Sequence, residues 1–316
     1  MKDTLGREIN YMRLSVTELC NLRCSYCMPE DGVCKKSHSQ MLTEDEMLLA
    51  IKIAAENGVR KLRITGGEPL VKPNILSICR RAAETPGIET LCLTTNGTLL
   101  KDLARPLREA GVQHINISLD TLDPEKYARI TRRGDLRDAL EGIDAALAAG
   151  FRTVKLNAVL IGGFNDDEIP ELARLTLKYP LDVRFIELMP MLSDEIFGAN
   201  AYLPNSQVCK MLPELEYEKS DGVASLYRLP QGLGSVGLIS PLSHEFCGSC
   251  SRIRLTADGK LKPCLHSDAE FSIKGLDEDG MRRQFEKAVL AKPARHGLLS
   301  AESRSLAGRD MNTIGG

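Results

Sequence analysis

The sequence predicts an α/β protein built on an incomplete (β/α)6 TIM-like barrel, followed by a C-terminal α+β region. Strand-like and helix-like runs alternate along the first part of the chain, and several of the strands have one apolar and one polar face. Alternating β and α elements give parallel strands joined by crossover helices. An open doubly wound sheet is covered on both faces and has near-continuous apolar strands, so the polar faces favour a wide barrel interior instead.

Six strand-like runs supply the predicted barrel. Side chains alternate across a strand, so in the first run Met12 and Leu14 oppose Arg13 and Ser15. The alternative is an antiparallel sheet with one solvated face, which the helical connections disfavour. The predicted strands cover residues 9–17, 61–65, 89–95, 114–120, 153–160 and 182–188.

Helix-like runs connect these strands. The first has the clearest boundaries, because Thr43 and Glu46 have the spacing of a capping box and Gly58 lies just past its end. Pro106 is expected to weaken or kink the third helix. The other predicted helices cover residues 74–85, 99–110, 136–149 and 166–179.

The pattern changes after residue 188. Residues 189–237 contain scattered prolines and glycines and are predicted to be irregular. We therefore expect residues 1–190 to form the partial barrel and residues 191–316 to form a second region. That region has a cysteine triplet, a predicted helix over residues 277–290 and a tail that ends in Gly315 and Gly316.

Composition limits the classes of function. With 43% hydrophobic and 27% charged residues the chain is globular, and its net charge of -2 gives no general attraction to nucleic acid or anionic membranes. No apolar run approaches the roughly 18 residues that span a bilayer, and the polar first ten residues lack a signal-peptide core. We expect a cytoplasmic protein, in which ten cysteines predict metal or redox chemistry rather than disulfides.

The first cysteine triplet follows the first strand directly. Cys20, Cys24 and Cys27 have the spacing C-x3-C-x2-C. Structural zinc needs a fourth ligand, for which Cys34 and His38 are the nearest candidates. Three thiolates can instead hold three irons of a four-iron cluster and leave the fourth iron open to a ligand. The end of a barrel strand is where active sites of barrel enzymes lie, which favours the cluster.

A second triplet has the spacing C-x2-C-x13-C and consists of Cys247, Cys250 and Cys264. His244 and His266 lie close enough in the sequence to make zinc an alternative. Between the cysteines, the predicted strand over residues 251–255 places two arginines on one face.

Basic residues from several strands face the proposed interior. Guanidinium groups match phosphate oxygens, so a dense positive site in a near-neutral protein suits a triphosphate. Separate ion pairs with Asp and Glu remain the alternative for any one of these residues. The basic residues are Arg13, Arg63, Lys155, Arg184, Arg252 and Arg254.

The first triplet, with Tyr26 before its last cysteine and Gly66-Gly67-Glu68-Pro69 after the second strand, resembles the radical S-adenosylmethionine (SAM) superfamily. The resemblance implies a [4Fe-4S] cluster on the triplet that cleaves SAM to methionine and a 5′-deoxyadenosyl radical. It also implies that SAM is bound by Tyr26, Gly67, Ser118 and Met189.

Both triplets, the Arg252-x-Arg254 motif and the terminal Gly315-Gly316 resemble the GTP-cyclising branch of that superfamily, which begins molybdenum cofactor biosynthesis. The resemblance implies a second [4Fe-4S] cluster on Cys247, Cys250 and Cys264. It implies catalytic roles for Arg252, Arg254, Gly315 and Gly316, and GTP contacts from Arg13, Arg63, Thr94, Lys155, Arg252 and Arg254, with Arg184 on the same face. A flavodoxin- or ferredoxin-type electron donor, a downstream cyclic pyranopterin monophosphate synthase and a homodimer are implied as well.

Two other functions are weighed against this one. A peptide-modifying radical SAM enzyme with an auxiliary cluster is disfavoured by the Arg-x-Arg motif and the Gly-Gly terminus. A zinc-binding interaction module would hold zinc at both triplets. Four further cysteines are interpreted as buried or incidental thiols, namely Cys34, Cys79, Cys92 and Cys209.

Overall fold

The protein, described here from a computed structural model, is built around one curved sheet. The structure describes residues 1–34, 36–191, 201–297, 299 and 305–315. Six parallel strands form the centre of the sheet and confirm the predicted barrel strands. They are β1 (Tyr11–Ser15), β2 (Lys61–Thr65), β3 (Thr90–Thr95), β4 (His114–Ser118), β5 (Thr153–Leu160) and β6 (Asp182–Glu187).

Strands from the second region extend the sheet at both ends. On one side β10 (Arg252–Leu255) pairs in parallel with β1, and β11 (Lys260–Lys262) and β12 (Phe271–Ser272) follow in antiparallel pairing. On the other side β9 (Val236–Ile239) pairs in parallel with β6, and β8 (Ala224–Arg228) and β7 (Glu216–Asp221) follow. Within the described residues the sheet is therefore open, with β12 and β7 at its edges.

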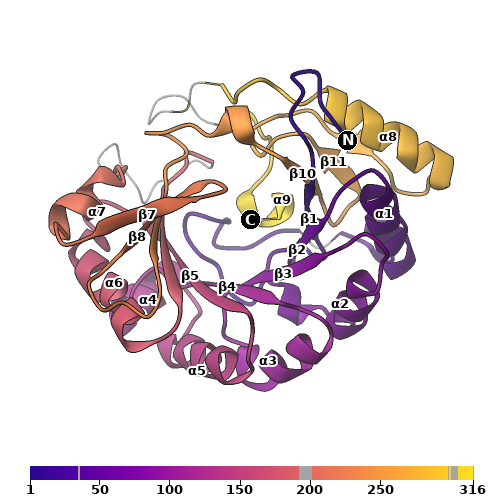
Figure 1. Cartoon of the computed structure of the whole chain (residues 1–316). Helices are drawn as coiled ribbons and strands as arrows, with labels where there is room; N and C mark the ends of the chain where they lie inside the picture. The colour runs from indigo at the N-terminus through magenta and orange to yellow at the C-terminus, as the bar shows by residue number, and fades with distance from the viewer. Residues whose placement is uncertain (35, 192–200, 298, 300–304, 316) are drawn as a thin grey trace.

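Helices cover the outside of the sheet (Figure 1). The capping box of the first helix is confirmed, because the Thr43 hydroxyl accepts from the Glu46 N–H at 3.2 Å and the Glu46 carboxylate accepts from the Thr43 N–H at 2.8 Å. Pro106 lies inside α3. The long helices are α1 (Glu44–Glu56), α2 (Ile75–Ala83), α3 (Leu100–Glu109), α5 (Leu136–Ala148), α6 (Ile169–Lys178) and α8 (Glu278–Leu290).

Two parts of the sequence prediction were incomplete or wrong. Helix α4 (Pro124–Thr131) was missed, although the Asp123 carboxylate caps it and Pro124 occupies its first position. The segment predicted to be irregular contains α7 (Ser206–Met211), β7, β8 and the start of β9, because these short elements gain their stability from pairing with the barrel. No described helix is long and apolar enough to cross a membrane.

The core lies between the outer helices and the sheet. Along β5 buried and half-buried residues alternate, as the predicted two-faced strands require. Met12, Leu14, Leu62, Ile64 and Ile253 are fully or almost fully buried on the helix side. The opposite face surrounds the interior, where the short C-terminal helix α9 (Met311–Ile314) lies at the centre of the ring of strands (Figure 1). The interior is thus lined by polar side chains and closed in part by the end of the chain.

Candidate active site

The first cysteine triplet lies in the loop that follows β1. This loop turns tightly, because the Cys24 carbonyl accepts from the N–H groups of Cys27 at 2.9 Å and Met28 at 3.2 Å. Burial raises the pKa of the Cys20 thiol to about 11, and burial together with the charge of Cys20 raises that of Cys27 to about 12. Buried thiols with raised pKa values stay protonated near neutral pH and lose their protons when they bind a metal centre.

The arrangement of the sulfur atoms bears on the choice between zinc and a cluster. Four ligands around one Zn²⁺ place their sulfurs about 3.8 Å apart, since Zn–S bonds are about 2.3 Å long. All six triplet cysteines are described, and neither triplet brings its three sulfurs within 4.8 Å of one another. Cys34 is exposed, and neither it nor His38 joins such a group among the described residues. Neither triplet is thus a ready-made site for one zinc ion, and three thiolates are the donor set that a four-iron cluster with one open position takes.

The glycine pair after β2 lets the chain approach the cysteine loop closely. The Gly67 N–H donates to the Thr17 carbonyl at 2.7 Å. A Cβ at Gly67 would collide with the carbonyl oxygens of Leu19 and Glu18, and one at Gly66 would lie 2.8 Å from the Thr17 oxygen. Both glycines are therefore needed where the backbone touches the loop that carries Cys20.

Glu68 joins the ends of β2 and β3. Its carboxylate is buried and accepts from the Thr95 hydroxyl at 2.7 Å, the Asn96 N–H at 2.7 Å and the Leu70 N–H at 3.0 Å. Burial raises the pKa of Glu68 to about 7. Asn96 also donates to Asn21 of the cysteine loop at 2.9 Å. Glu68 thus ties the glycine turn to the loop after β3.

The predicted SAM residues lie around the same end of the sheet. Tyr26 donates its hydroxyl proton to the Asp120 carboxylate at 2.7 Å, and the other Asp120 oxygen accepts from the Val159 N–H at 2.8 Å. Burial raises the pKa of Asp120 to about 6. Ser118 is half-buried at the end of β4, and Met189 packs in a small apolar cluster with Ile314 of the tail.

The register of the sheet brings three arginines of the basic face side by side. Arg13 of β1 lies opposite Arg254 of β10 and Arg63 of β2. The Arg63 guanidinium donates to the Tyr11 hydroxyl at 2.7 Å and to the Thr94 hydroxyl at 3.1 Å. The Nε of Arg13 is buried and has no hydrogen-bond partner among the described residues.

Charge is left uncompensated at this face. Burial lowers the pKa of Arg13, as do the charges of Arg254 and Arg63. No carboxylate among the described residues pairs with Arg13, Arg63, Arg252 or Arg254. A buried donor and several buried cations without anions form a site for an anionic ligand.

Lys155 and Arg184 are in a different situation. The Asp182 carboxylate lies 3.6 Å from the Lys155 amine and 3.0 Å from the Arg184 guanidinium, and Asp221 lies 3.6 Å and 3.8 Å from them. Arg184 fills the space beside Gly237, where any Cβ would collide with it. These two residues therefore make ion pairs with acidic residues, although one nitrogen of Arg184 has no partner among the described residues.

Tyr11 lies among the arginines, and the pKa of its phenol depends on their charge. Burial alone would raise the pKa of its phenol, but the charges of Arg63, Arg13 and Arg252 outweigh burial and lower the pKa to about 8. We predict that one tyrosine of the metal-free protein titrates near pH 8 and that Tyr11→Phe removes this step. The chain has seven tyrosines and no tryptophan, so phenolate absorbance near 295 nm measures it directly.

Inorganic triphosphate provides the control for this titration. The anion neutralises the arginines and should raise the pKa of Tyr11 towards the ordinary tyrosine value of about 10. A wild-type protein in which no tyrosine titrates below pH 9 would show that the positive charges are already compensated.

The C-terminal tail enters the interior and contacts both halves of the site. The Gly315 carbonyl accepts from the Arg254 guanidinium at 3.1 Å, and a Cβ on Gly315 would lie 2.7 Å from the Thr65 hydroxyl. The Asn312 amide donates to the Glu18 carbonyl, close to the first triplet, at 3.0 Å. Gly315 is left-handed, with φ of 83°. The predicted site residue Gly316 lies outside the described residues.

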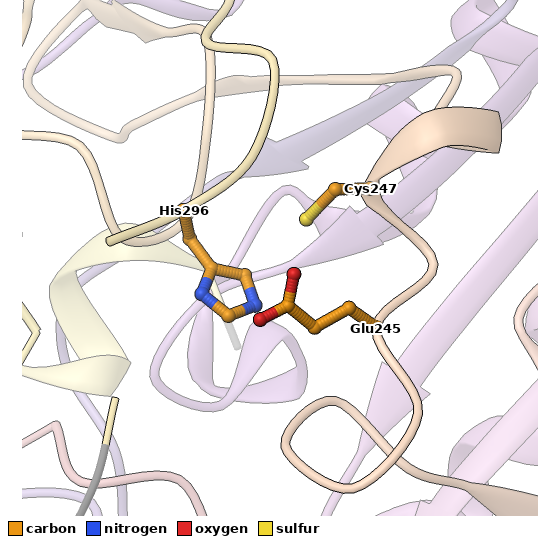
Figure 2. A group of neighbouring side chains, drawn as sticks. All are labelled: Glu245, Cys247 and His296. Atoms are coloured by element: carbon orange, nitrogen blue, oxygen red, sulfur yellow. The ribbon is translucent and has the colours of Figure 1, made fainter. Parts of the chain in front are cut away.

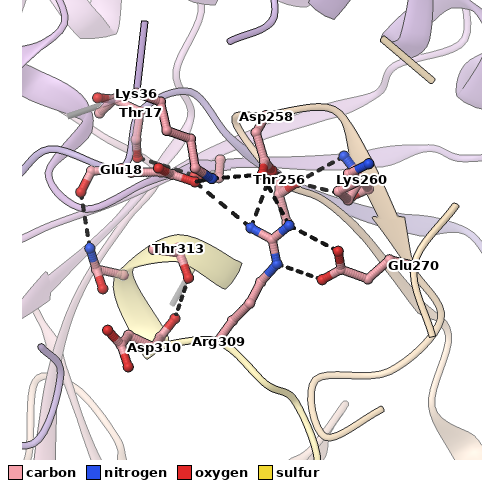
Figure 3. A network of polar contacts seen from close by, with 12 residues as sticks. Thr17, Glu18, Lys36, Thr256, Asp258, Lys260, Glu270, Arg309, Asp310 and Thr313 are labelled. Carbon is pink, nitrogen blue, oxygen red and sulfur yellow. Dashed lines mark hydrogen bonds and ion pairs between the residues drawn. The ribbon is translucent and has the colours of Figure 1, made fainter. Parts of the chain in front are cut away.

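Arg309 anchors this tail in a network of mostly half-buried charges (Figure 3). Its guanidinium makes paired hydrogen bonds with Asp258, at 3.3 and 3.0 Å, and with Glu270, at 2.5 and 2.9 Å. Lys36 lies 2.7 Å from both Asp258 and Glu18. The network therefore joins the tail, the β10–β12 side of the sheet and the cysteine loop.

The second triplet is supported by residues from distant parts of the sequence. The buried Lys292 amine donates to the carbonyls of Arg252 and Pro263, both at 2.8 Å, which fixes the chain just after Cys250 and just before Cys264. The Arg7 guanidinium donates to the Cys247 carbonyl at 2.8 Å. His244 and His266 do not join Cys247 in a group of potential metal ligands, and the His266 ring instead contacts the Ser305 hydroxyl at 3.0 Å.

Two family models match this chain: the radical SAM superfamily over residues 14–176, and Molybdenum Cofactor Synthesis C over residues 181–298. The chain therefore belongs to the radical SAM superfamily. Along its whole length it is similar to proteins named GTP 3′,8-cyclase. It is 48% identical to that of Alkaliphilus oremlandii and 46% identical to those of Alkaliphilus metalliredigens and Moorella thermoacetica, with 100% of each chain covered.

Solved structures with lower sequence identity show the same fold. SuiB of Streptococcus suis, bound to its precursor peptide SuiA, matches with a TM-score of 0.62 at 15% identity, over 82% of this chain and 60% of SuiB. Methylornithine synthase (PylB) matches with a TM-score of 0.53 at 18% identity, over 66% of this chain and 62% of PylB. At this identity the likeness concerns the fold alone.

Several residues of the site were not predicted from the sequence. Each of these residues makes hydrogen bonds with residues that are far away in the sequence, so no local spacing points to them. They are Tyr11, Asp120, Lys292, Arg309 and Asn312. Glu68 is the exception, because it belongs to the Gly66-Gly67-Glu68-Pro69 motif and could have been predicted as a site residue from that motif.

Proposed function

We propose that this chain cyclises GTP to (8S)-3′,8-cyclo-7,8-dihydroguanosine 5′-triphosphate, the first step of molybdenum cofactor biosynthesis. The observation that carries this function is the uncompensated basic face of Arg13, Arg63 and Arg254, which lies on strands adjoining both cysteine triplets. Full-length similarity to GTP 3′,8-cyclases supports the same reaction. The protein is thus a radical SAM lyase with two [4Fe-4S] clusters and SAM as its cofactor.

Cys20, Cys24 and Cys27 hold the first cluster in this proposal. When bound, that cluster supplies the electron that cleaves SAM to methionine and a 5′-deoxyadenosyl radical. The surrounding residues fix the cofactor in place, and the Tyr26–Asp120 hydrogen bond orients the tyrosine ring. The proposed SAM-binding residues are Tyr26, Gly67, Ser118 and Met189.

The basic face positions the substrate. Arg13 and Arg63 offer donors to the triphosphate, while Thr94 is oriented by its hydrogen bond from Arg63. Holding the ribose in one orientation is a large part of such catalysis, because a misplaced radical would attack the protein. The proposed GTP-binding residues are Arg13, Arg63, Thr94, Lys155, Arg184, Arg252 and Arg254.

Cys247, Cys250 and Cys264 hold the second cluster, which when bound offers an open coordination position to the guanine base. Arg252 and Arg254 lie between these cysteines in the sequence, and Arg254 holds the carbonyl of Gly315. We assign catalytic roles to Arg252, Arg254, Gly315 and Gly316. The tail also excludes water from the interior.

The wider setting is proposed on the same basis. We place the protein in the cytoplasm, with a flavodoxin- or ferredoxin-type electron donor, a downstream cyclic pyranopterin monophosphate synthase and a homodimeric state. We also keep the division into residues 1–190, which generate the radical, and residues 191–316, which hold the second cluster and the tail.

One assay tests the function directly. The protein is reconstituted anaerobically with iron and sulfide, supplied with reductant and SAM, and 5′-deoxyadenosine is measured with GTP, with ATP and without nucleotide. We expect GTP-dependent deoxyadenosine and a GTP-derived isomer by mass spectrometry. Deoxyadenosine that does not depend on the nucleotide would keep the superfamily but exclude GTP as the substrate. A cluster-loaded protein that forms none would exclude the enzyme itself.

A further inference from the structure

Glu245, Cys247 and His296 form a second group of potential metal ligands, beside the second triplet. Their ligand atoms lie within 4.8 Å of one another, the one such group of at least three residues within the described part of the chain. Figure 2 shows the His296 ring directed at the Glu245 carboxylate, with the Cys247 sulfur above both. Cysteine sulfur, imidazole nitrogen and carboxylate oxygen together are a donor set that Zn²⁺ and Fe²⁺ accept.

The protonation of His296 prepares it for a metal. Its Nδ1 lies 2.8 Å from the Gly297 carbonyl, which can only accept, so Nδ1 carries the proton. In the neutral ring the remaining nitrogen, Nε2, has a free lone pair, and it points towards the Glu245 carboxylate (Figure 2). A backbone carbonyl on the far nitrogen is the usual partner of a metal-binding histidine. Two acceptors that face each other repel unless a proton or a cation lies between them.

We propose that Glu245, Cys247 and His296 bind one divalent transition-metal ion of the Zn²⁺ or Fe²⁺ type in the protein before its second cluster is built. Binding releases one proton from the Cys247 thiol, whereas the carboxylate and the neutral imidazole bind without losing any. The group is reachable from solvent, since Glu245 is exposed and the other two residues are half-buried. The fourth position of the ion is left to water.

Cys247 belongs to both this group and the second triplet, so one sulfur serves two competing metal centres. An ion held by Cys247 and His296 removes the first of the three thiolates that the second cluster needs. A bound Zn²⁺ therefore competes with assembly of the second cluster. This inference concerns the cluster-free protein and does not depend on the proposed reaction.

A cobalt titration tests the site. The metal-free full-length chain carries Cys20→Ser, Cys24→Ser and Cys27→Ser, so that the first triplet binds nothing, and Co²⁺ is added anaerobically. We expect one equivalent to bind, with the near-ultraviolet band of a cobalt–thiolate bond. His296→Ala and Glu245→Gln should each weaken binding by at least about tenfold. Cys247→Ser should remove the thiolate band.

Matched variants separate this site from the triplet. His244→Ala alters the neighbouring histidine, and Cys264→Ser destroys the triplet without touching the proposed site, so both should bind Co²⁺ as the parent protein does. If Cys264→Ser abolishes binding while His296→Ala and His296→Gln leave it unchanged, the ion belongs to the triplet and the proposal is wrong. Circular dichroism of each variant verifies its fold.

Iron reconstitution tests the competition. With one equivalent of Zn²⁺ present, the same parent protein should take up less iron, and His296→Ala should remove the effect of zinc. Equal inhibition in both proteins would show that zinc acts elsewhere. Because these readouts are metal binding and iron content, a failure here is distinct from a failure of the GTP assay.

Discussion

Gly67→Ala is expected to empty the first cluster site and to reduce deoxyadenosine formation to background. The new Cβ would meet the backbone carbonyls of Leu19 and Glu18, which cannot rotate away as a side chain does. The cysteine loop must then move, and the hydrogen bond from the Glu68 N–H to the Leu19 carbonyl, at 2.8 Å, is strained or lost. Overpacking of this kind costs about 1–3 kcal/mol. Iron content and electron paramagnetic resonance measure the result.

The expected result is specific to one half of the protein. Iron per chain should fall by half, because the second triplet lies in another loop and keeps its cluster. Gly150→Ala serves as the control, since its φ of 74° strains an alanine by about 1–3 kcal/mol although its Cβ would meet nothing within 4 Å, and it lies in neither cysteine loop. Full iron content in Gly67→Ala would mean that the cysteine loop accommodates the new methyl group. The contact of Gly67 with the Glu18 and Leu19 backbone would then have no part in holding the cluster.

Arg309→Ala is expected to loosen the tail and to destabilise the fold by about 1–3 kcal/mol, because the charged hydrogen bonds of a half-buried guanidinium are lost while both carboxylates keep a lysine partner. The Arg309 side chain is 15% exposed and faces Asp258 and Glu270, at 11% and 22%. Its loss leaves Glu270 with Lys262 and Asp258 with Lys36, and the tail then depends on its neutral contacts, such as those of Asn312 with the Glu18 carbonyl and Ile314 with Met189. Urea unfolding and hydrogen exchange across residues 305–315 measure the two effects.

A surface arginine with similar partners is the control. Arg282 pairs with Glu56 and Glu278 at a more exposed position, so Arg282→Ala should change stability by no more than about 1 kcal/mol. Arg309→Lys keeps the charge and should restore part of both stability and tail protection. If Arg309→Ala loses stability but residues 305–315 stay protected from exchange, Arg309 does not position the tail.

The local part of this protein could be predicted from its sequence. Period-two patterns located β1 to β6, and the Thr43 capping box located the start of α1, because both depend only on neighbouring residues. The polar strand faces predicted a lined interior. The short elements α7, β7 and β8 were missed for separate reasons. Helix α7 has only six residues, every residue of β7 is exposed, and β8 alternates in burial over only five residues.

The candidate site could likewise be predicted in part from the sequence. Spacing alone located both cysteine triplets and the Arg252-x-Arg254 motif, and side-chain alternation located the arginines of the basic face. The sequence pattern could not show which of these basic residues have carboxylate partners. Lys155 and Arg184 have them, whereas Arg13 and Arg63 have none among the described residues. That difference depends on Asp182 and on the distant Asp221.

The sequence by itself thus determined the class of chemistry, since residue types and short spacings decide which ligands lie in one loop. Only the tertiary structure decided how the two halves meet. Strand β10 pairs with β1, which brings Arg254 beside Arg13, and Arg309 and Arg254 hold the tail in the interior. Likewise, only the folded chain places His296 beside Cys247. The physical reason is that strand pairing and ion pairs join residues that lie tens to hundreds of positions apart, and no local pattern in the chain records these contacts.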